Sequence, residues 1–360
     1  MVTCQHYPEV FVLYMAKSVQ NVVDLFCGCG GFSLGFERAG FHIAIGIDVW
    51  KDALTTFKFN HKSSQVLQAD LSEIKPSEIQ PLLNGNSVDV IIGGPPCQGF
   101  SVAGKRIVDD IRNKLYKSFV NFVSFYQPKA FVMENVPNIL SIGGGAVREE
   151  ILKDFSNLGY TVEYRILTAS DFGVPQNRRR AIFVGFRNGH HFVFPEPLNS
   201  DKITAKEAIS DLPEQSLVDG AHYPSVSSSI YQKKMRQNSL GVFNHQATVH
   251  NEKTKEIISL VPDGGNYKDL PIELQGTRKV HIAWTRLNSK KPSFTIDTGH
   301  RHHFHYSYNR IPTARESARI QSFPDDFIFT CSRTSQLKQI GNAVPPLLGQ
   351  AIAKSLLEQL

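Results

Sequence analysis

Residues 21–31, NVVDLFCGCGG, join an apolar run to a glycine-rich turn. The run Asn21–Phe26 is rich in β-branched residues and predicts a buried strand. A helical pattern follows over Phe32–Arg38 and ends at Gly40. Glycines after a strand let a ligand approach the backbone closely, so this unit predicts a ligand site. Ser33 stands where a third glycine of GxGxxG would fall, which disfavours a dinucleotide ligand.

Strand-like and helix-like runs alternate as far as residue 187. Apolar runs predict strands at His42–Ile47, Gln65–Ala69, Val88–Ile92, Lys129–Met133, Tyr160–Leu167 and Ala181–Phe186. Helical spacing predicts helices at Trp50–Asn60 and Asn113–Tyr126. This alternation predicts an α/β fold with a doubly wound, mostly parallel sheet and helices on both faces. Ligands bind such sheets at the carboxyl ends of the strands, so the residues after each strand are the candidate site.

The character of the chain changes after Asn188. Pro, Ser, Asn and His become frequent, and ten of the thirteen histidines lie between His190 and His305. Helical patterns return at Thr313–Gln321 and Pro346–Leu357. We therefore expect a catalytic and cofactor-binding domain over residues 1–187 plus 311–360, and a smaller irregular domain over residues 188–310.

Composition narrows the class of protein. The chain has 360 residues and a formal net charge of +6, which favours a polyanionic partner but is also common among soluble enzymes. The five cysteines are irregularly spaced, so we expect a reducing compartment rather than a disulfide framework. The chain shows neither a membrane-spanning apolar run nor a secretory signal, so we expect a cytoplasmic protein without a membrane partner.

Four motifs carry reactive or charged groups. The loop GGPPCQGFS, residues 93–101, surrounds Cys97 with two prolines and three glycines, and a stiff loop can hold a thiolate in one attack geometry. Glu134, at the end of a predicted strand, can donate or accept a proton. The arginines of QNRRR can bind phosphates or orient a base, unless they form a solvated charge run. Asp48 and Asp70 end the second and third strands and can accept hydrogen bonds from a ribose and an adenine, although a lone aspartate there is more often a turn former.

Six motifs occur in the order DLFCGCGGFSLGFERAGF, GGPPCQGFS, ENV, QNRRR, RESARIQSFPDDF and IGNAVPP. They resemble the ordered motifs of the bacterial cytosine-C5 DNA methyltransferases of restriction-modification systems, over roughly Asn21–Ile352 with the middle segment unmatched. The resemblance implies the S-adenosylmethionine-dependent methyltransferase fold and S-adenosyl-L-methionine as cofactor. It also implies that residues 188–310 are a target-recognition domain and that the substrate is a specific double-stranded DNA sequence.

The resemblance implies roles for individual residues. Cys97 is expected to be the nucleophile that adds to C6 of a flipped-out cytosine, and this addition makes C5 reactive enough to take a methyl group. Glu134 is expected to hold the ring and help protonate it, and Arg178 and Arg180 to complete the catalytic set. The expected cofactor contacts are Phe26, Gly28, Gly30, Gly31, Asp48, Asp70, Leu71, Leu115, Asn342 and Val344.

The middle segment is the expected DNA reader. Between Arg278 and Arg319, nine Lys or Arg residues stand against two acidic ones, which predicts phosphate contacts. Four histidines in residues 300–305 match no zinc spacing, so we expect a DNA-facing loop there and no metal site. Arg301 could read a guanine edge. The expected DNA contacts are Gln98, Ser101 and Arg301.

Three other functions remain open from the sequence. They are cytosine-C5 methylation of structured RNA such as tRNA, a nicotinamide-dependent oxidoreductase on the same sheet, and an inactive DNA-binding relative. The long middle domain favours DNA over RNA, and intact Cys97, Glu134 and Arg180 disfavour the inactive relative. We expect a monomer, associated with the bacterial nucleoid through DNA, with a cognate restriction endonuclease as its functional companion. The recognised sequence does not follow from these motifs.

Overall fold

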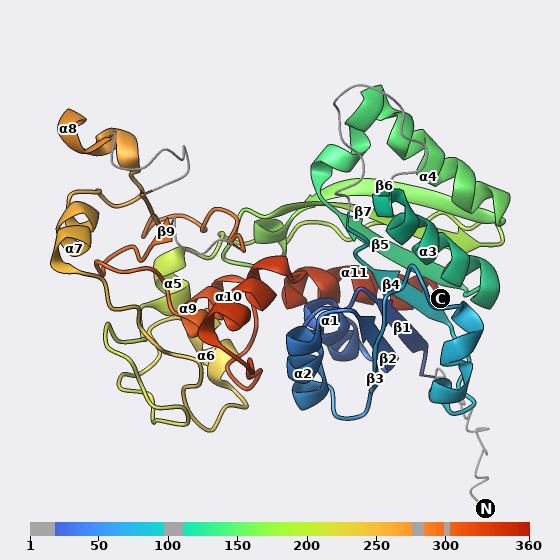
Figure 1. The fold of residues 1–360 in the computed structure, drawn as a ribbon, viewed down its shortest axis with the longest axis horizontal. Helices are drawn as coiled ribbons and strands as arrows, with labels where there is room; N and C mark the ends of the chain where they lie inside the picture. Colours follow the sequence, from blue (N-terminus) through green and yellow to red (C-terminus); the bar gives the residue numbers. More distant parts are fainter. Residues whose placement is uncertain (1–18, 97–110, 276–283, 299–302) are drawn as a thin grey trace, which may run out of the picture.

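The computed structural model describes residues 19–96, 111–275, 284–298 and 303–360. Its larger part is a seven-stranded sheet in the order β3-β2-β1-β4-β5-β7-β6 (Figure 1). Strands β1 to β5 are parallel, and β7 runs antiparallel to both of its neighbours, β5 and β6. The predicted α/β class and mostly parallel sheet are confirmed. The strands are β1 (Asn21–Leu25), β2 (His42–Asp48), β3 (Gln65–Gln68), β4 (Val90–Gly93), β5 (Ala130–Asn135), β6 (Tyr160–Thr168) and β7 (Arg179–Arg187).

Helices cover both faces of the sheet because successive strand residues point to opposite sides. Val22 packs into one hydrophobic core with Phe36 of α1 and Ile352 of α11. Val23 packs into the other core with Phe119 of α3 and Phe155 of α4. The helices are α1 (Gly31–Ala39), α2 (Lys51–Asn60), α3 (Ile111–Tyr126), α4 (Ala146–Asn157) and α11 (Pro346–Gln359), with short 3-10 turns at Pro76–Leu83, Pro137–Leu140, Ile142–Gly145 and Ala169–Phe172.

Most strand boundaries shift by one or two residues from the sequence prediction, and two of these shifts bear on the site. The predicted strand Lys129–Met133 extends to Asn135, so Glu134 lies inside β5, opposite Ile182. The predicted strand Ala181–Phe186 begins at Arg179, so two of the three arginines belong to β7 rather than preceding it. The ladder between β5 and β7 continues to Asn135, and the ladder between β6 and β7 continues to Arg179, so both extensions follow antiparallel pairing at the carboxyl edge of the sheet. The apolar periodicity in the sequence ends before the strands do, since the polar side chains of Glu134 and Arg180 face the site.

The second part of the chain has few regular elements, as its composition predicts. It contains α5 (Ala205–Ile209), α6 (Ile230–Arg236), α7 (Glu252–Ser259), α8 (Ile272–Gln275), a 3-10 turn at Tyr267–Asp269, and a short parallel pair of β8 (Thr285–Arg286) and β9 (His303–Phe304). Helix α5 packs against α9 (Ala314–Ile320), and α10 (Arg333–Asn342) packs against α9 in turn (Figure 1). No helix in the described ranges is long and apolar enough to cross a membrane.

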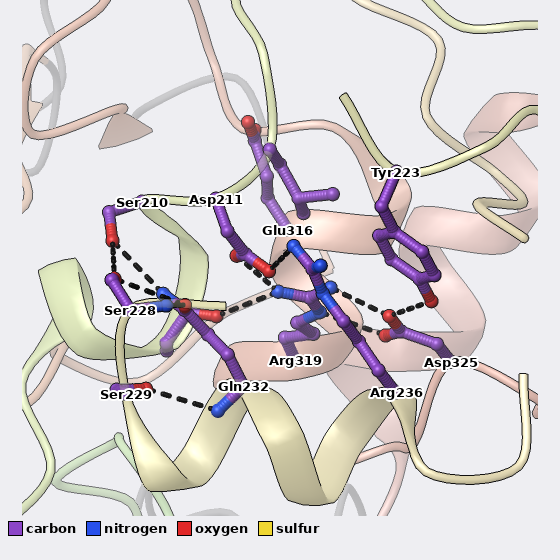
Figure 2. Close-up of polar contacts among 12 residues, drawn as sticks. Ser210, Asp211, Tyr223, Ser228, Ser229, Gln232, Arg236, Glu316, Arg319 and Asp325 are labelled. Carbon is purple, nitrogen blue, oxygen red and sulfur yellow. Dashed lines mark hydrogen bonds and ion pairs between the residues drawn. The ribbon is translucent and has the colours of Figure 1, made fainter. Parts of the chain in front are cut away.

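A buried ion network holds α5 and α6 against α9 (Figure 2). Arg319 donates to Asp325 through Nε at 2.8 Å and through Nη2 at 2.6 Å, and its Nη1 donates to Asp211 at 2.5 Å. Arg236 of α6 also pairs with Asp211, and the Tyr223 hydroxyl donates to Asp325 at 2.6 Å. Because the Arg319 side chain is fully buried, its contacts must replace the hydration that the charge loses.

Several arginines of the basic segment serve the fold rather than DNA. Arg286, Arg310, Arg315 and Arg319 are at most 5% exposed and donate to carbonyl or carboxylate oxygens. The expectation that this segment contacts phosphates is therefore wrong for these four side chains, because buried guanidinium groups cannot reach a duplex. Lys290 and Lys291 are exposed, and the other cations of the segment, Arg278, Lys279 and Arg301, lie outside the described residues.

The two described histidines of the cluster at residues 300–305 are also buried. His303 and His305 are buried rather than facing DNA, which corrects the expectation of a DNA-facing loop for these two residues. The His305 Nδ1 accepts hydrogen bonds from the backbone of Ser307 and Tyr308 at 3.1 and 3.0 Å. Burial lowers the pKa of His305 to about 4, although Glu316 lies 3.8 Å away. Residues 299–302 lie outside the described part.

Replacing Arg319 with alanine should destabilise the protein by about 3 to 5 kcal/mol, because it leaves two buried carboxylates short of their main partner. Chemical denaturation followed by circular dichroism measures the free energy of unfolding. Lys290→Ala, an exposed change in the same basic segment, should stay within about 0.5 kcal/mol of wild type. Equal stability of Arg319→Ala and wild type would contradict the structural role of this network.

His305 should make stability depend on pH. Its pKa is lowered in the fold from an ordinary value of 6.5 to about 4, so the unfolded chain binds more protons between these values. Its contribution, about 3 kcal/mol, is present above pH 6.5 and is lost as the pH falls towards 4. In His305→Asn, the free energy of unfolding should change less between pH 7 and pH 5 than in wild type. His190→Asn, at an exposed histidine, should keep the wild-type slope.

Candidate active site

A cavity of about 640 Å³ lies at the carboxyl edge of the sheet, beside the point between β1 and β4 where the strand order reverses. Ligands bind at this position in open α/β sheets. The structure brings most of the predicted site residues to its wall. They are Phe26, Gly28, Gly31, Asp48, Asp70, Leu71, Leu115, Glu134, Arg178, Arg180, Asn342 and Val344.

The glycine turn forms one wall of the cavity. Gly28 has a φ of +54°, and a Cβ added there would meet no atom within 4 Å, so it would project into open space. Phe26 lines the same wall with a φ of +60°, which is unusual for a residue with a side chain. A bare backbone next to an aromatic ring is suited to a flat ligand that approaches closely.

Asp48 and Trp50 form the adjoining wall. The Asp48 carboxylate accepts hydrogen bonds from the backbone N–H of Gly28 at 2.9 Å and of Trp50 at 2.8 Å. Burial raises the pKa of Asp48, and these backbone bonds oppose that rise. Each carboxylate oxygen has further lone pairs, so Asp48 can still accept from ligand hydroxyls. Lys338 lies 4.8 Å from the centre of the Trp50 ring.

Gly30 does not line the cavity, unlike the other expected cofactor contacts. It caps α1 with a φ of +93°, and a Cβ there would lie 2.1 Å from Nε2 of His61. The His61 ring is buried beneath the turn and its Nδ1 lies 2.8 Å from a carboxylate oxygen of Glu37. Gly30 therefore serves the packing of the turn, because only glycine fits both the left-handed backbone and the close approach.

A charged group occupies the opposite side of the cavity. The Nε of Arg180 lies 2.6 Å from Oε1 of Glu134, and both side chains are 12% exposed. Arg178 is buried, and its Nη1 donates to the backbone oxygen of Ile296 at 3.2 Å. Burial, aided by the neighbouring Arg180, lowers the pKa of Arg178 to about 9, so it still carries its charge at neutral pH. This side of the cavity thus offers the Glu134 carboxylate and two guanidinium groups to a polar ligand.

Asn135 positions the loop that leads to Cys97. Its side-chain amide donates to the backbone oxygen of Pro95 at 2.9 Å, and its carbonyl accepts from the N–H of Val136 at 2.9 Å. Pro95 and Pro96 line the cavity next to Glu134. Cys97 itself lies outside the described residues, as do the expected DNA contacts Gln98, Ser101 and Arg301.

The sequence reasoning missed several cavity residues. Trp50 was assigned only to a helix, yet an aromatic residue two positions after Asp48 is a usable signal for a ligand wall. Ile296 and Asp297 arrive from the second part of the chain, and no motif marks them. Asp24 lies below the turn, where burial raises its pKa to about 8 although Ser33 donates to it at 2.6 Å. The alternation of strand and helix patterns in the sequence does not predict the hydrogen bond between Ser33 and Asp24.

The cysteines in the turn are buried thiols. Cys27 and Cys29 are free and buried. Burial raises the pKa of both thiols, that of Cys29 to about 12, so they are poor nucleophiles. Within the described ranges, no cluster of three His, Cys, Asp or Glu side chains could hold a metal ion.

Comparisons with known proteins agree on one family. The family model for C-5 cytosine-specific DNA methylase matches residues 20–358. Type II methyltransferase M1.HphI of Haemophilus parahaemolyticus is 42% identical, with 93% of this chain and 86% of the relative covered. Type II methyltransferase M.DdeI of Desulfomicrobium norvegicum is 39% identical, with 93% and 88% covered.

A solved structure supports the same assignment. It is a prophage-encoded E. coli protein, assigned as a DNA modification methyltransferase, with 29% identity, a TM-score of 0.77 and coverage of 94% of this chain and 99% of its own. The family match spans nearly the whole chain, and the cavity, the glycine turn and the Glu134–Arg180 pair all lie within it. This protein belongs to the C-5 cytosine-specific DNA methylase family.

Proposed function

We propose that this protein transfers a methyl group from S-adenosyl-L-methionine to C5 of a cytosine in a specific double-stranded DNA sequence. The proposal rests on a single cavity whose two walls carry different chemical groups. The glycine turn and Asp48 form one wall, and the Glu134–Arg180 pair forms the other. The relatives named type II methyltransferases favour DNA over tRNA as substrate, and the family membership argues against a nicotinamide-dependent oxidoreductase.

The cavity fits the proposed cofactor in size and chemistry. Its volume of about 640 Å³ lies within the usual range for small-molecule sites. Asp48 would accept from the ribose hydroxyls, Asp70 from the adenine amino group, and Phe26 would cover the ring. Gly28 leaves room along the turn, while Gly31 lines the cavity where it packs closely against the backbone of Val344. When bound, the cofactor supplies an electrophilic methyl group on sulfur. The remaining contacts would come from Leu71, Leu115, Asn342 and Val344.

The chain's own residues would activate the cytosine. The Cys97 thiolate would form a bond to C6, which pushes electron density towards C5. Glu134 would hold the ring at N3 and the exocyclic amine, and help to protonate N3. Arg180 fixes one oxygen of that carboxylate at 2.6 Å, while Arg178 adds positive charge nearby. After methyl transfer, a base removes the C5 proton and the Cys97–C6 bond breaks. C5 and C6 are inaccessible within a base stack, so the cytosine must be flipped into the cavity.

DNA reading is proposed for the second part of the chain. We assign residues 188–310 to target recognition and residues 1–187 plus 311–360 to catalysis, with Gln98, Ser101 and Arg301 as DNA contacts. The relatives' type II names support a role in protecting host DNA from a partner restriction endonuclease. We further propose a cytoplasmic monomer that associates with the nucleoid through DNA.

Expression in a host that lacks cytosine methylation should produce 5-methylcytosine at one recurring DNA sequence, detected by bisulfite sequencing of plasmid DNA. The Cys97→Ser variant should abolish this signal yet still bind DNA and cofactor, because the weaker nucleophile fails only in the covalent step. Host tRNA sequenced in parallel should stay unmodified. Methylation confined to tRNA would overturn the proposed substrate, and full activity of Cys97→Ser would overturn the assigned nucleophile.

Glu134→Gln should lower kcat by about a hundredfold or more, since general acid–base groups contribute roughly 10²–10⁴ to rate. A tritiated-methyl transfer assay measures kcat directly. Glu149→Gln serves as the matched control, because Glu149 is 65% exposed on α4 and away from the cavity. Turnover of Glu134→Gln near the wild-type rate would show that another group protonates the ring.

A further inference from the structure

Two buried glutamines connect four segments of the chain beside the cavity. The backbone N–H of Ile296 donates to Oε1 of Gln176 at 3.0 Å. Nε2 of Gln176 donates to Oε1 of Gln321, and Nε2 of Gln321 donates to the backbone oxygen of Ala343 at 2.6 Å. Both glutamines are fully buried. The result is a continuous chain of three hydrogen bonds between Ile296 and Ala343, which both line the cavity.

The direction of this chain is fixed at both ends. Ile296 can offer only an N–H to Gln176, so Gln176 must present its oxygen there and its amine towards Gln321. Ala343 offers a carbonyl, so Gln321 must present its amine there and its oxygen towards Gln176. The two amide orientations are therefore mutually consistent, and turning either amide over would place like groups against each other.

The ends of the chain belong to different halves of the site. At one end, the backbone oxygen of Ile296 accepts from the catalytic candidate Arg178 at 3.2 Å. At the other end, Ala343 lies between Asn342 and Val344, which are candidate cofactor contacts, and all three line the cavity. The segment around Ile296 is also held to the start of β7 by backbone bonds between Ser293 and residues 175 and 177.

Burial makes this connection stiff. A buried amide that loses its hydrogen-bond partner costs free energy. Each glutamine is therefore expected to keep its hydrogen bonds when neighbouring segments move. If the backbone at Ala343, beside the proposed cofactor site, shifts, this chain of hydrogen bonds would carry the shift through Gln321 and Gln176 to Ile296, which binds Arg178. Gln321 also follows directly from α9, the helix whose Arg319 anchors the second part of the chain.

We propose that Gln176 and Gln321 are positioning residues that couple cofactor binding to the geometry of the cytosine site. This rests on the proposed function, since the two ends are the proposed cofactor and base sites. The coupling makes the two ligands bind more tightly together than either does alone. Neither glutamine touches the reacting atoms. Their effect is exerted through Ala343 on one side and through Ile296 and Arg178 on the other.

The test measures this coupling directly. The Kd of a duplex that carries the bisulfite-mapped site is measured with and without saturating S-adenosylhomocysteine, and the value without it divided by the value with it is the coupling factor. Wild type should give a ratio clearly above one. In Gln321→Leu and Gln176→Leu the ratio should fall towards one, and KM for the cofactor should rise about tenfold, the effect of losing one buried hydrogen bond. Gln350→Leu is the control, because the Gln350 side chain donates to the Arg38 carbonyl on α1 and does not line the cavity in the described part of the chain.

A double-mutant cycle separates a relay from two independent structural roles. In a relay the double variant should lose no more coupling than either single variant, because one break already interrupts the chain. Additive losses, or a ratio unchanged from wild type, would overturn the proposal. If the leucine variants do not fold, Gln321→Glu keeps the acceptor for Gln176 and replaces the donor to Ala343 with a carboxylate oxygen, and it should still lower the ratio. A wild-type enzyme that methylates DNA with a ratio of one would reject the relay and leave the proposed function intact.

Discussion

The reversed direction of β7 decides how the active site is assembled. In a fully parallel sheet, the first residues of a strand lie at the edge opposite the ligand. Because β7 is antiparallel, its start reaches the carboxyl edge, where β5 ends. Glu134 and Arg180 therefore come from opposite ends of their strands and meet at 2.6 Å. The ladder with β7 holds the backbone of Glu134, and the ladder with β6 holds that of Arg180, so their geometry is set before any ligand arrives.

Helix α9 holds the irregular part of the chain in place. Among its described residues, that part has no sheet of its own beyond the short β8–β9 pair, and buried charged groups hold it in place. Arg319 binds Asp211 from within this part, and Gln321, just beyond the helix, reaches the cavity wall. Buried ions and amides tolerate few alternative arrangements, because each misplaced group loses its hydration without compensation. A loosely structured segment can thus be held in one orientation against a rigid sheet.

Much of the fold was predictable from local patterns. Apolar runs located all seven strands, and the glycine turn at residues 26–31 marked the cavity wall. The errors have physical causes. Glu134 and Arg180 look like loop residues because polar side chains end the apolar periodicity, although Glu134 pairs with β7 and Arg180 pairs with β6. The basic segment suggested phosphate contacts, yet Arg286 and Arg319 are buried among oxygen acceptors. The position of a charged residue in the sequence does not reveal whether its side chain faces solvent or the interior.

By itself the sequence determined the fold class, the family motifs and which side chains are available for chemistry, because these depend on residue type and short-range spacing. Only the tertiary structure decided the partners of those side chains. It paired Arg180 with Glu134, moved Gly30 from the cofactor wall into the packing beneath the turn, and joined Ile296 to Ala343 through two glutamines. These contacts link residues far apart in the chain, and their geometry arises only when the strands, α9 and the irregular segment pack together.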